Sequence, residues 1–262
     1  MTRTRLDQAL QELDTQMRRL GALIEHALAQ ALEALEMGDQ DKAGTVIVSD
    51  TAIDDLHLMI EEQTFRTLTL QQPLGGRDLR YLTSLVPMTI DLERIGDEAV
   101  AIAQNVLRMM PFRSGGIYQA QTRTQQVQGE NSLSTSGGEG DQFSEASIMQ
   151  GILDLGQMVR SLIQETMQAF ANRDAEAARR LWEEDKVVDR GAYIVRRDVM
   201  AMLEGAHAMP ALRDDPYILQ RVTCLLWIAH ELERVADHCT NICERIVFIV
   251  QGETDIHPPL EP

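Results

Sequence analysis

The feature of this sequence that most restricts its fold is an internal repeat of two acidic motifs in the same order. The segments DLERIGDEA and ELERVADHC begin at residues 91 and 231, which are 140 positions apart. A pair of aspartates four residues apart precedes each segment, and these pairs begin at Asp50 and Asp185, 135 positions apart. Two motifs in the same order, with one insertion between them, are typical of an internal duplication. The sequence therefore predicts two similar units in tandem.

Apolar residues recur in both halves with the 3.6-residue period of an α-helix. The first such stripe ends before Gly38 and consists of Leu6, Leu10, Leu13, Met17, Leu20, Ile24, Leu28, Ala31 and Leu35. Five further helical segments are expected at about residues 39–71, 78–109, 145–171, 174–207 and 216–251. Each half therefore contains three helices. We expect Pro87 to bend the third helix, because proline removes a backbone hydrogen bond.

The composition agrees with an all-α fold. Hydrophobic residues make up 44% of the chain and aromatic residues only 4%, so aliphatic side chains must fill the core. We expect two tandem antiparallel three-helix bundles with six long helices, at residues 1–110 and 145–252. Residues 111–144 are rich in Gly, Ser, Thr and Gln and are predicted to be a flexible linker, and residues 253–262 a loose tail.

Net charge, hydropathy and cysteine content together restrict the classes of function, and the formal net charge is −17. An acidic surface repels phosphate backbones, so we expect no binding to nucleic acid. No apolar run approaches the ~18 residues of a membrane span, and the first residues lack the apolar core of a secretion signal. Three cysteines, an odd number, suit a reducing compartment. We therefore expect a cytoplasmic protein without direct membrane insertion.

Four pairs of carboxylates four residues apart stand on the second and third expected helices of the two halves. They are Asp50 and Asp54, Glu93 and Asp97, Asp185 and Asp189, and Glu233 and Asp237, with Asn241 one turn beyond the last pair. Residues at this spacing share one helix face, and like charges there destabilise a helix by ~0.2 to 0.5 kcal/mol per pair. A bound cation converts this repulsion into coordination, and oxygen ligands favour hard ions such as Mg²⁺, Mn²⁺, Ca²⁺ or Fe³⁺.

The same pattern also fits ordinary solvated helix faces of an acidic protein, with Arg94 and Arg234 as local salt-bridge partners. Against this interpretation, the acids lie next to apolar positions such as Ile53, Leu92 and Leu232. The duplication does not decide between the two, because it copies a neutral surface as readily as a site. The residues alone leave both interpretations open.

Motifs of several enzyme classes are incomplete or absent. The segment HELER begins at His230 like a zinc-protease helix, but Arg234 stands in place of the second histidine. A di-iron centre of the ferritin type needs two Glu-x-x-His elements, and the chain has one, at Glu204 and His207. The sequence contains no nucleotide-binding glycine loop and no nucleophile elbow. We therefore expect a protein that is not an enzyme.

The segments QQPLGGRDLR and DLERIGDEAVAIA in the first half, and ELERVADHCTNICE in the second, resemble the PhoU family of phosphate-uptake regulators. The resemblance covers nearly the whole chain except residues 111–144. It implies two three-helix bundles related by a pseudo-two-fold axis, which often associate as a homodimer. It also implies that the acidic motifs hold metal ions, with Fe, Mn, Mg, Ca and Zn as candidates.

Carried over by position, the resemblance also implies the ligands of two metal centres. The ligands in the first bundle are Asp50, Asp54, Glu93 and Asp97. Those in the second bundle are Asp185, Asp189, Glu233, Asp237 and Asn241. The family commonly has His and Asn where this chain has Glu98 and Ala101. The resemblance therefore favours metal binding in the second half over the first.

The role implied by the resemblance is regulatory. PhoU proteins damp phosphate import and hold the phosphate-responsive sensor histidine kinase in its inhibitory state. We accordingly expect a non-enzymatic adaptor between the ATPase subunit of the phosphate ABC transporter and that kinase, recruited by these partners to the inner face of the membrane. Two alternatives stay open, a helical protein of metal storage or metal redox chemistry and an accessory protein of another phosphate transporter.

Overall fold

The computed structural model describes residues 3–71, 73–112, 144–204 and 217–252, and within these ranges every regular element is a helix. The first half contains α1 (Arg3–Met37), α2 (Gln40–Ser49), α3 (Thr51–Leu70), α4 (Gly76–Met109) and the 3-10 turn η1 (Met110–Phe112). The second half contains α6 (Glu145–Asn172), α7 (Ala175–Glu204) and α9 (Ile218–Gln251). The all-α fold is confirmed. Most of the expected linker, residues 113–143, and the expected tail lie outside the described residues.

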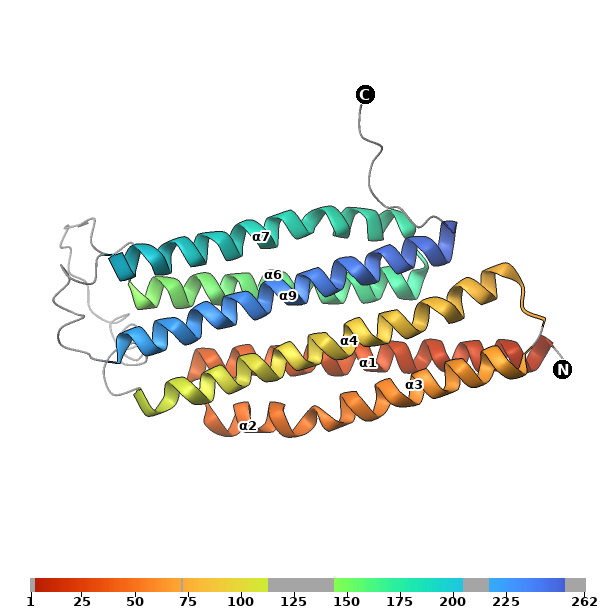
Figure 1. The fold of residues 1–262 in the computed structure, drawn as a ribbon, viewed down its shortest axis with the longest axis horizontal. Coiled ribbons are helices and arrows are strands. Elements are labelled where there is room, and N and C mark those ends of the chain that lie inside the picture. The colour runs from red at the N-terminus through yellow and green to blue at the C-terminus, as the bar shows by residue number, and fades with distance from the viewer. Residues whose placement is uncertain (1–2, 72, 113–143, 205–216, 253–262) are drawn as a thin grey trace, which may run out of the picture.

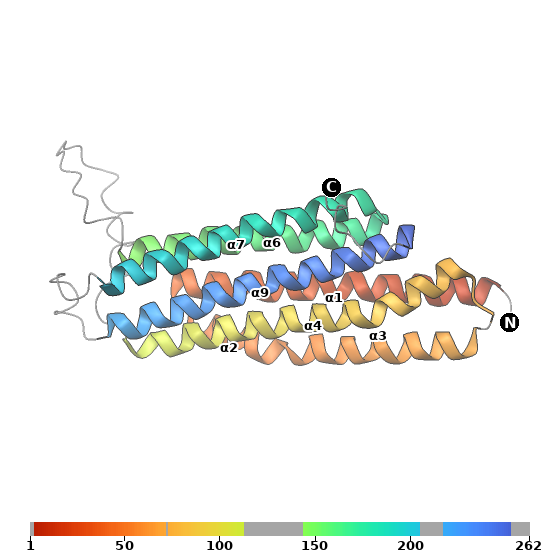
Figure 2. The ribbon, with the colours of Figure 1, turned by 45° about the horizontal axis from the view of Figure 1, so that its top comes forward.

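Each half folds into an antiparallel bundle, and the two bundles pack side by side (Figure 1). In the first bundle α1 packs against α2, α3 and α4, and in the second bundle α6, α7 and α9 pack against one another. The bundles meet through two antiparallel helix pairs, α4 with α9 and α1 with α6 (Figure 2). The helices α3, α4, α9 and α7 thereby form one layer, behind which α1 and α6 lie.

Contacts between α1 and α6 show that the bundles are related by a pseudo-two-fold axis. Gly21 of α1 faces Met167 of α6, and Gly156 of α6 faces Leu32 of α1. Gly21 and Gly156 are 135 positions apart, as are Leu32 and Met167, so the two contacts are reciprocal. A Cβ atom on Gly156 would lie 2.7 Å from Leu32 Cδ2, so the close approach of the helices depends on the missing side chain.

The second helix of the first bundle is interrupted, although the sequence indicates one continuous helix over residues 39–71. Helix α2 ends at Ser49 and α3 begins at Thr51, with Asp50 at the turn between them. The Ser49 hydroxyl donates a hydrogen bond to the Val46 carbonyl at 2.9 Å. Ser, Asp and Thr side chains compete in this way for backbone groups, which favours a break where the three occur in a row.

Helix α4 runs through Pro87 without interruption. Its N-terminal part turns away from the line of the rest, as expected for an internal proline (Figure 2). Aliphatic side chains from every described α-helix fill one continuous core, which joins the two bundles. None of the described helices combines the length and the hydropathy needed to cross a lipid bilayer.

Candidate functional site

The four carboxylates of the first half come together between α3 and α4. We name Asp50, Asp54, Glu93 and Asp97 the first acidic centre. Burial raises the pKa of Asp50 to about 6, and the charges of Asp54, Asp97 and Glu93 add to the shift. Burial and the charge of Asp97 also raise the pKa of Glu93, against the opposing charges of Arg94 and His57. The four groups therefore form one electrostatic unit.

The four carboxylates of the second half form an equivalent group between α7 and α9. We name Asp185, Asp189, Glu233 and Asp237 the second acidic centre. Burial raises the pKa of Asp185 to about 6, and Asp189, Asp237 and Glu233 add to the shift. The Oδ1 atom of Asp185 is buried and has no hydrogen-bond partner among the described residues. A carboxylate oxygen in this state favours a proton or a cation as its partner.

A small residue in the middle of each third helix lets the acidic helices approach each other. A Cβ atom on Gly96 of α4 would lie 3.2 Å from Ile53 Cγ2 and 3.5 Å from Asp50 Oδ1. The equivalent residue of α9 is Ala236, which is fully buried. Apolar residues next to the acids, Ile53 in the first bundle and Val188 in the second, are buried as well. The carboxylates therefore stand at the edge of a packed seam, where burial on one side strengthens the repulsion between them and solvent on the other side screens part of it.

Arginines neutralise the two acidic centres to different degrees. In the first centre, Arg94 lies 3.0 Å from Asp97 and 3.6 Å from Glu93, but its side chain is 53% exposed. Exposed ion pairs of this kind contribute ~0 to 1 kcal/mol. In the second centre, Nη1 and Nη2 of Arg196 donate to the two carboxylate oxygens of Glu233, each at 2.9 Å. Glu233 is therefore held by a bidentate ion pair.

Asn241, the ninth candidate ligand from the sequence, reaches across to the other bundle. Its Nδ2 atom donates to Asp91 Oδ1 of α4 at 3.0 Å. Nδ1 of His238 lies 2.9 Å from the same oxygen. The structure therefore brings Asn241 to the interface between α4 and α9.

The pseudo-symmetric counterpart of this contact joins Glu98 of α4 to Glu231 of α9. Arg234 lies between them, 2.9 Å from Glu98 and 3.8 Å from Glu231. Burial and hydrogen bonding to Glu231 raise the pKa of Glu98 to about 8, so that this carboxyl keeps its proton near neutral pH. Neither helical periodicity nor the acidic pairs indicated that these residues meet at the interface. The sequence did contain one signal for them. The repeat offset of 140 residues relates Asp91 to Glu231 and Glu98 to His238, and so relates the two interface contacts to each other.

The residues of the two centres suit a metal ion in type, although not yet in arrangement. In the described part of the chain, no three histidine, cysteine or carboxylate side chains already surround a common ion position. Carboxylate oxygens are nevertheless the ligands that hard divalent cations prefer. The unpartnered Oδ1 atom of Asp185 and the raised pKa values of Asp50 and Asp185 fit groups that gain from a nearby positive charge. Metal binding at the two centres stays a prediction.

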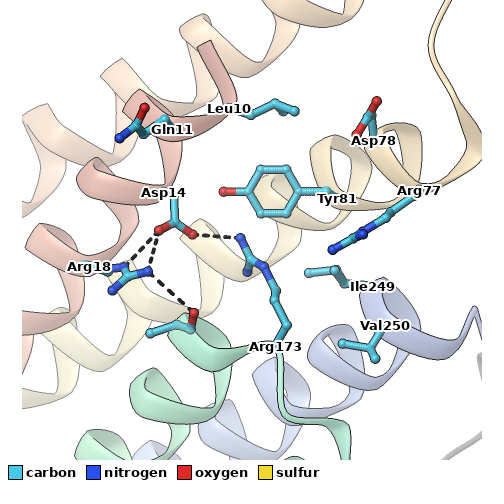
Figure 3. A pocket seen from close by; sticks show the side chains of 11 residues that line it. Leu10, Gln11, Asp14, Arg18, Arg77, Asp78, Tyr81, Arg173, Ile249 and Val250 are labelled. Atoms are coloured by element: carbon cyan, nitrogen blue, oxygen red, sulfur yellow. Dashed lines mark hydrogen bonds and ion pairs between the residues drawn. The ribbon is translucent and has the colours of Figure 1, made fainter. Parts of the chain in front are cut away.

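A pocket of about 830 Å³ lies apart from both centres, where α1 and α4 meet the ends of α6 and α9 (Figure 3). Arg18 and Arg173 reach into it, and both pair with Asp14 at 2.7 Å. The guanidinium of Arg173 also lies 4.5 Å from the ring centroid of Tyr81 and 4.4 Å from that of Phe170. Arg173 thus joins the end of α6 to α1, and Arg18 of α1 also donates to the Ala171 carbonyl of α6 at 3.4 Å. Both arginines are therefore engaged in joining the bundles, which leaves the acidic centres as the stronger functional candidate.

Comparison with known proteins connects the two bundles to one family. The model of the PhoU domain matches residues 17–106 and 152–246, one match in each bundle. A protein of Clostridium acetobutylicum named phosphate-specific transport system accessory protein PhoU homolog is 27% identical over 97% of both chains. The phosphate-specific transport system accessory protein PhoU of Escherichia coli K12 is 27% identical over 95% of this chain and 86% of its own.

Two crystal structures show the same fold. PhoU from Pseudomonas aeruginosa superposes with a TM-score of 0.73 at 28% identity, over 94% of this chain and 99% of its own. The phosphate transport system regulatory protein PhoU from Streptococcus pneumoniae superposes with a TM-score of 0.72 at 26% identity, over 95% and 99%. These similarities span both bundles and the helices that carry the acidic centres. The chain therefore belongs to the PhoU family.

Proposed function

We propose that this chain is a non-enzymatic regulator of phosphate uptake. The observation that carries the proposal is the match of the PhoU domain to both bundles. Relatives that align over nearly their whole length are named accessory proteins of a phosphate-specific transport system, and one solved relative is named a regulatory protein of phosphate transport. Similarity over the full length favours the same role here, because both repeats and their order are kept.

In this role the chain acts as an adaptor between the ATPase subunit of a phosphate ABC transporter and the phosphate-responsive sensor histidine kinase. Exposed apolar side chains on the outer helices support a docking role. They occupy equivalent positions in the two bundles, with Leu58, Met59 and Phe65 on α3, and Tyr193, Ile194 and Met200 on α7. We name these residues the outer apolar faces. Two similar faces on one molecule suit an adaptor, or a homodimer that uses one of them.

Metal ions at the acidic centres belong to the same proposal. The carboxylates of the first centre join α3 to α4, and those of the second join α7 to α9. A bound cation supplies positive charge that offsets the repulsion between these carboxylates. The carboxylates then hold α3 against α4 and α7 against α9. The outer apolar faces, which lie on α3 and α7, are held in place with these helices. Cation binding thereby sets the position of the docking surfaces.

The test is a strain that lacks the gene for this chain and carries a reporter for phosphate-regulated genes. In high phosphate the strain should express the reporter constitutively, and the intact chain should restore repression. Replacement of Leu58 and Phe65 by serine should reduce repression, whereas the exposed control Thr69→Ser on α3 should restore it fully. A deletion strain that still represses the reporter contradicts the proposal, and oxygen uptake with Fe²⁺ by the purified chain would favour metal redox chemistry instead.

A further inference from the structure

The pocket between the two bundles gathers positive charge in a chain whose formal net charge is −17 (Figure 3). We name it the interbundle pocket. Its charged lining consists of three arginines, Arg18, Arg77 and Arg173, and two aspartates, Asp14 and Asp78. Its volume of about 830 Å³ lies in the range of small-molecule sites. Because the arginines outnumber the aspartates, the pocket favours an anion as its ligand.

The ion pairs that join the bundles use only part of this positive charge. Asp14 lies 2.7 Å from Arg18 and 2.7 Å from Arg173, so two guanidinium groups share one carboxylate. Arg77, in the first turn of α4, is exposed and forms no hydrogen bond or ion pair with a described residue. A guanidinium group carries five N–H donors. The pocket therefore keeps donors and charge that its structural role does not need.

The hydroxyl group of Tyr81 is a second and independent sign of a ligand. The Tyr81 side chain lines the pocket and is only 7% exposed, and its ring lies 4.5 Å from the Arg173 guanidinium. The hydroxyl oxygen is buried and has no hydrogen-bond partner among the described residues. Figure 3 shows it pointing into the pocket on the side of Asp14. Buried hydroxyl groups normally have a partner, so this one indicates a ligand atom that accepts a hydrogen bond.

Burial raises the pKa of Tyr81 to about 12, so the hydroxyl keeps its proton and serves as a donor. The N-terminus of α4 lies beside it, and the N-cap residue, Gly75, has no side chain to cap the first turn. Free amide groups at a helix N-terminus favour an anion such as phosphate. Leu10, Ile249 and Val250 add an apolar part to the lining. This combination suits a ligand with a charged end and an organic body.

From these observations we infer that the interbundle pocket binds a phosphate-type oxyanion. Arg77 and the Tyr81 hydroxyl hold it, together with the two guanidinium groups that share Asp14. The oxyanion is free phosphate or the phosphate group of a small organic molecule, and the volume and apolar lining favour the organic molecule. A ligand in this pocket contacts helices of both bundles and so strengthens their association. The inference goes beyond the proposed function, which assigns no small ligand, and it does not depend on cations at the acidic centres.

The experiment titrates the purified full chain by isothermal calorimetry with three probes, inorganic phosphate, AMP and ATP. A chelator is present, so that no metal ion at the acidic centres can bind a probe. At least one probe should bind with a stoichiometry of one, and added salt should weaken the binding. Tighter binding of a nucleotide assigns the site to organic phosphates, and equal binding of all three assigns it to the phosphate group alone. The absence of saturable binding by all three probes overturns the inference.

Variants of the lining place the binding in this pocket. Tyr81→Phe removes only the hydroxyl and should weaken binding by about tenfold or more. Because this hydroxyl has no partner in the folded chain, the variant should unfold at the same urea concentration as the intact chain or at a higher one. Arg77→Met should weaken binding by about two- to fivefold. Arg19→Met, at an exposed arginine of α1 outside the pocket, is the control that should change nothing. Binding that both pocket variants leave intact lies elsewhere and overturns the inference.

Asp14→Asn tests the shared carboxylate. The amide frees the positive charge of Arg18 and Arg173 for the ligand, so the affinity for the bound probe should rise by about threefold or more. An unchanged or lower affinity in a variant that keeps its helical circular dichroism overturns the inference. If this variant unfolds, Tyr81→Phe decides. These titrations involve no phosphate signalling, so their outcome is separate from that of the reporter strain.

Discussion

Asp50 and Asp185 occupy equivalent positions and carry the same electrostatic penalty. Burial, together with three neighbouring carboxylates, raises the pKa of each from 3.8 to about 6. Between pH 4 and 6 the folded chain therefore retains protons that the unfolded chain has released. The free energy of unfolding of the ion-free chain falls as the pH rises through this window, and the loss is complete above it.

A substitution at Asp50 tests whether the free energy of unfolding falls as the pH rises. In the presence of a chelator, Asp50→Asn should raise the free energy of unfolding at pH 7.5 by ~1 kcal/mol, because the amide removes a partly buried negative charge beside three other carboxylates. At pH 4 the gain should vanish, since the folded protein already carries a proton there. Urea unfolding followed by circular dichroism measures both values. The exposed neighbour Asp55→Asn is the control, and an equal gain at both pH values contradicts the explanation.

At the residue scale, spacing alone located the eight carboxylates but not their partners. The i, i+4 pairs are visible because one helix turn brings both acids to one face. His57 lies on the same helix face as Asp54, one turn further along the helix. Arg196 lies on the same helix face as Asp189, two turns further along, so neither residue belongs to the acidic pairs. Asn241 has its partner on α4, and that contact depends on how the two bundles cross, which no local pattern encodes.

At the element scale, the period of the apolar residues predicted where the helices lie but not where a helix is interrupted. The stripe that begins at Leu6 and ends before Gly38 corresponds to α1, since its apolar residues line the core. The break at Asp50 follows instead a serine whose hydroxyl bonds the Val46 carbonyl, and this polar residue leaves the apolar period intact. The expected end of one helix at His207 and the expected start of the next at Pro216 both lie outside the described residues.

The α1–α6 crossing gives a prediction for helix packing. Gly156→Ala should lower the free energy of unfolding by ~1 to 2 kcal/mol, because the new Cβ atom would lie 2.7 Å from a Leu32 methyl group in a packed core. Gly44→Ala is the matched control, since a Cβ atom at Gly44 of α2 meets nothing within 4 Å. It should stabilise the chain by ~0.5 to 1 kcal/mol. Thermal unfolding of both variants decides, and a stabilised Gly156→Ala variant contradicts the close crossing.

A buried ion pair fixes the start of α6 to α9. Nε and Nη2 of Arg221 lie 2.7 and 2.8 Å from the two carboxylate oxygens of Glu145, and the side chains are 3% and 8% exposed. Arg221→Met should cost ~3 to 5 kcal/mol, because it leaves a buried carboxylate without its partner. The double variant Arg221→Met with Glu145→Leu should recover most of this loss. Chemical unfolding tests the cycle, and additive losses would show that the two side chains are not coupled.

At the scale of the whole molecule, the duplication appears as a symmetry of contacts. Glu25 and Arg160, 135 positions apart, form an ion pair of 2.7 Å with each other, which places them at the pseudo-two-fold axis. The repeat in the sequence predicted two bundles, because each half carries its own three apolar stripes. It did not predict that α4 would pack against α9, since that choice depends on the shapes of completed bundles.

The symmetry also places both acidic centres in one layer of helices, together with the outer apolar faces on α3 and α7. Both centres therefore adjoin the central pair α4 and α9. A cation bound at either centre acts on an outer helix from within this layer. We propose a cation site at each of the two acidic centres, each between a central helix and an outer helix.

Anomalous diffraction from crystals of the full chain grown with Mn²⁺ tests this claim most directly. If cations occupy the acidic centres as proposed, one peak is expected between α3 and α4 beside the first acidic centre, and another between α7 and α9 beside the second acidic centre. The absence of a peak at both centres would contradict it.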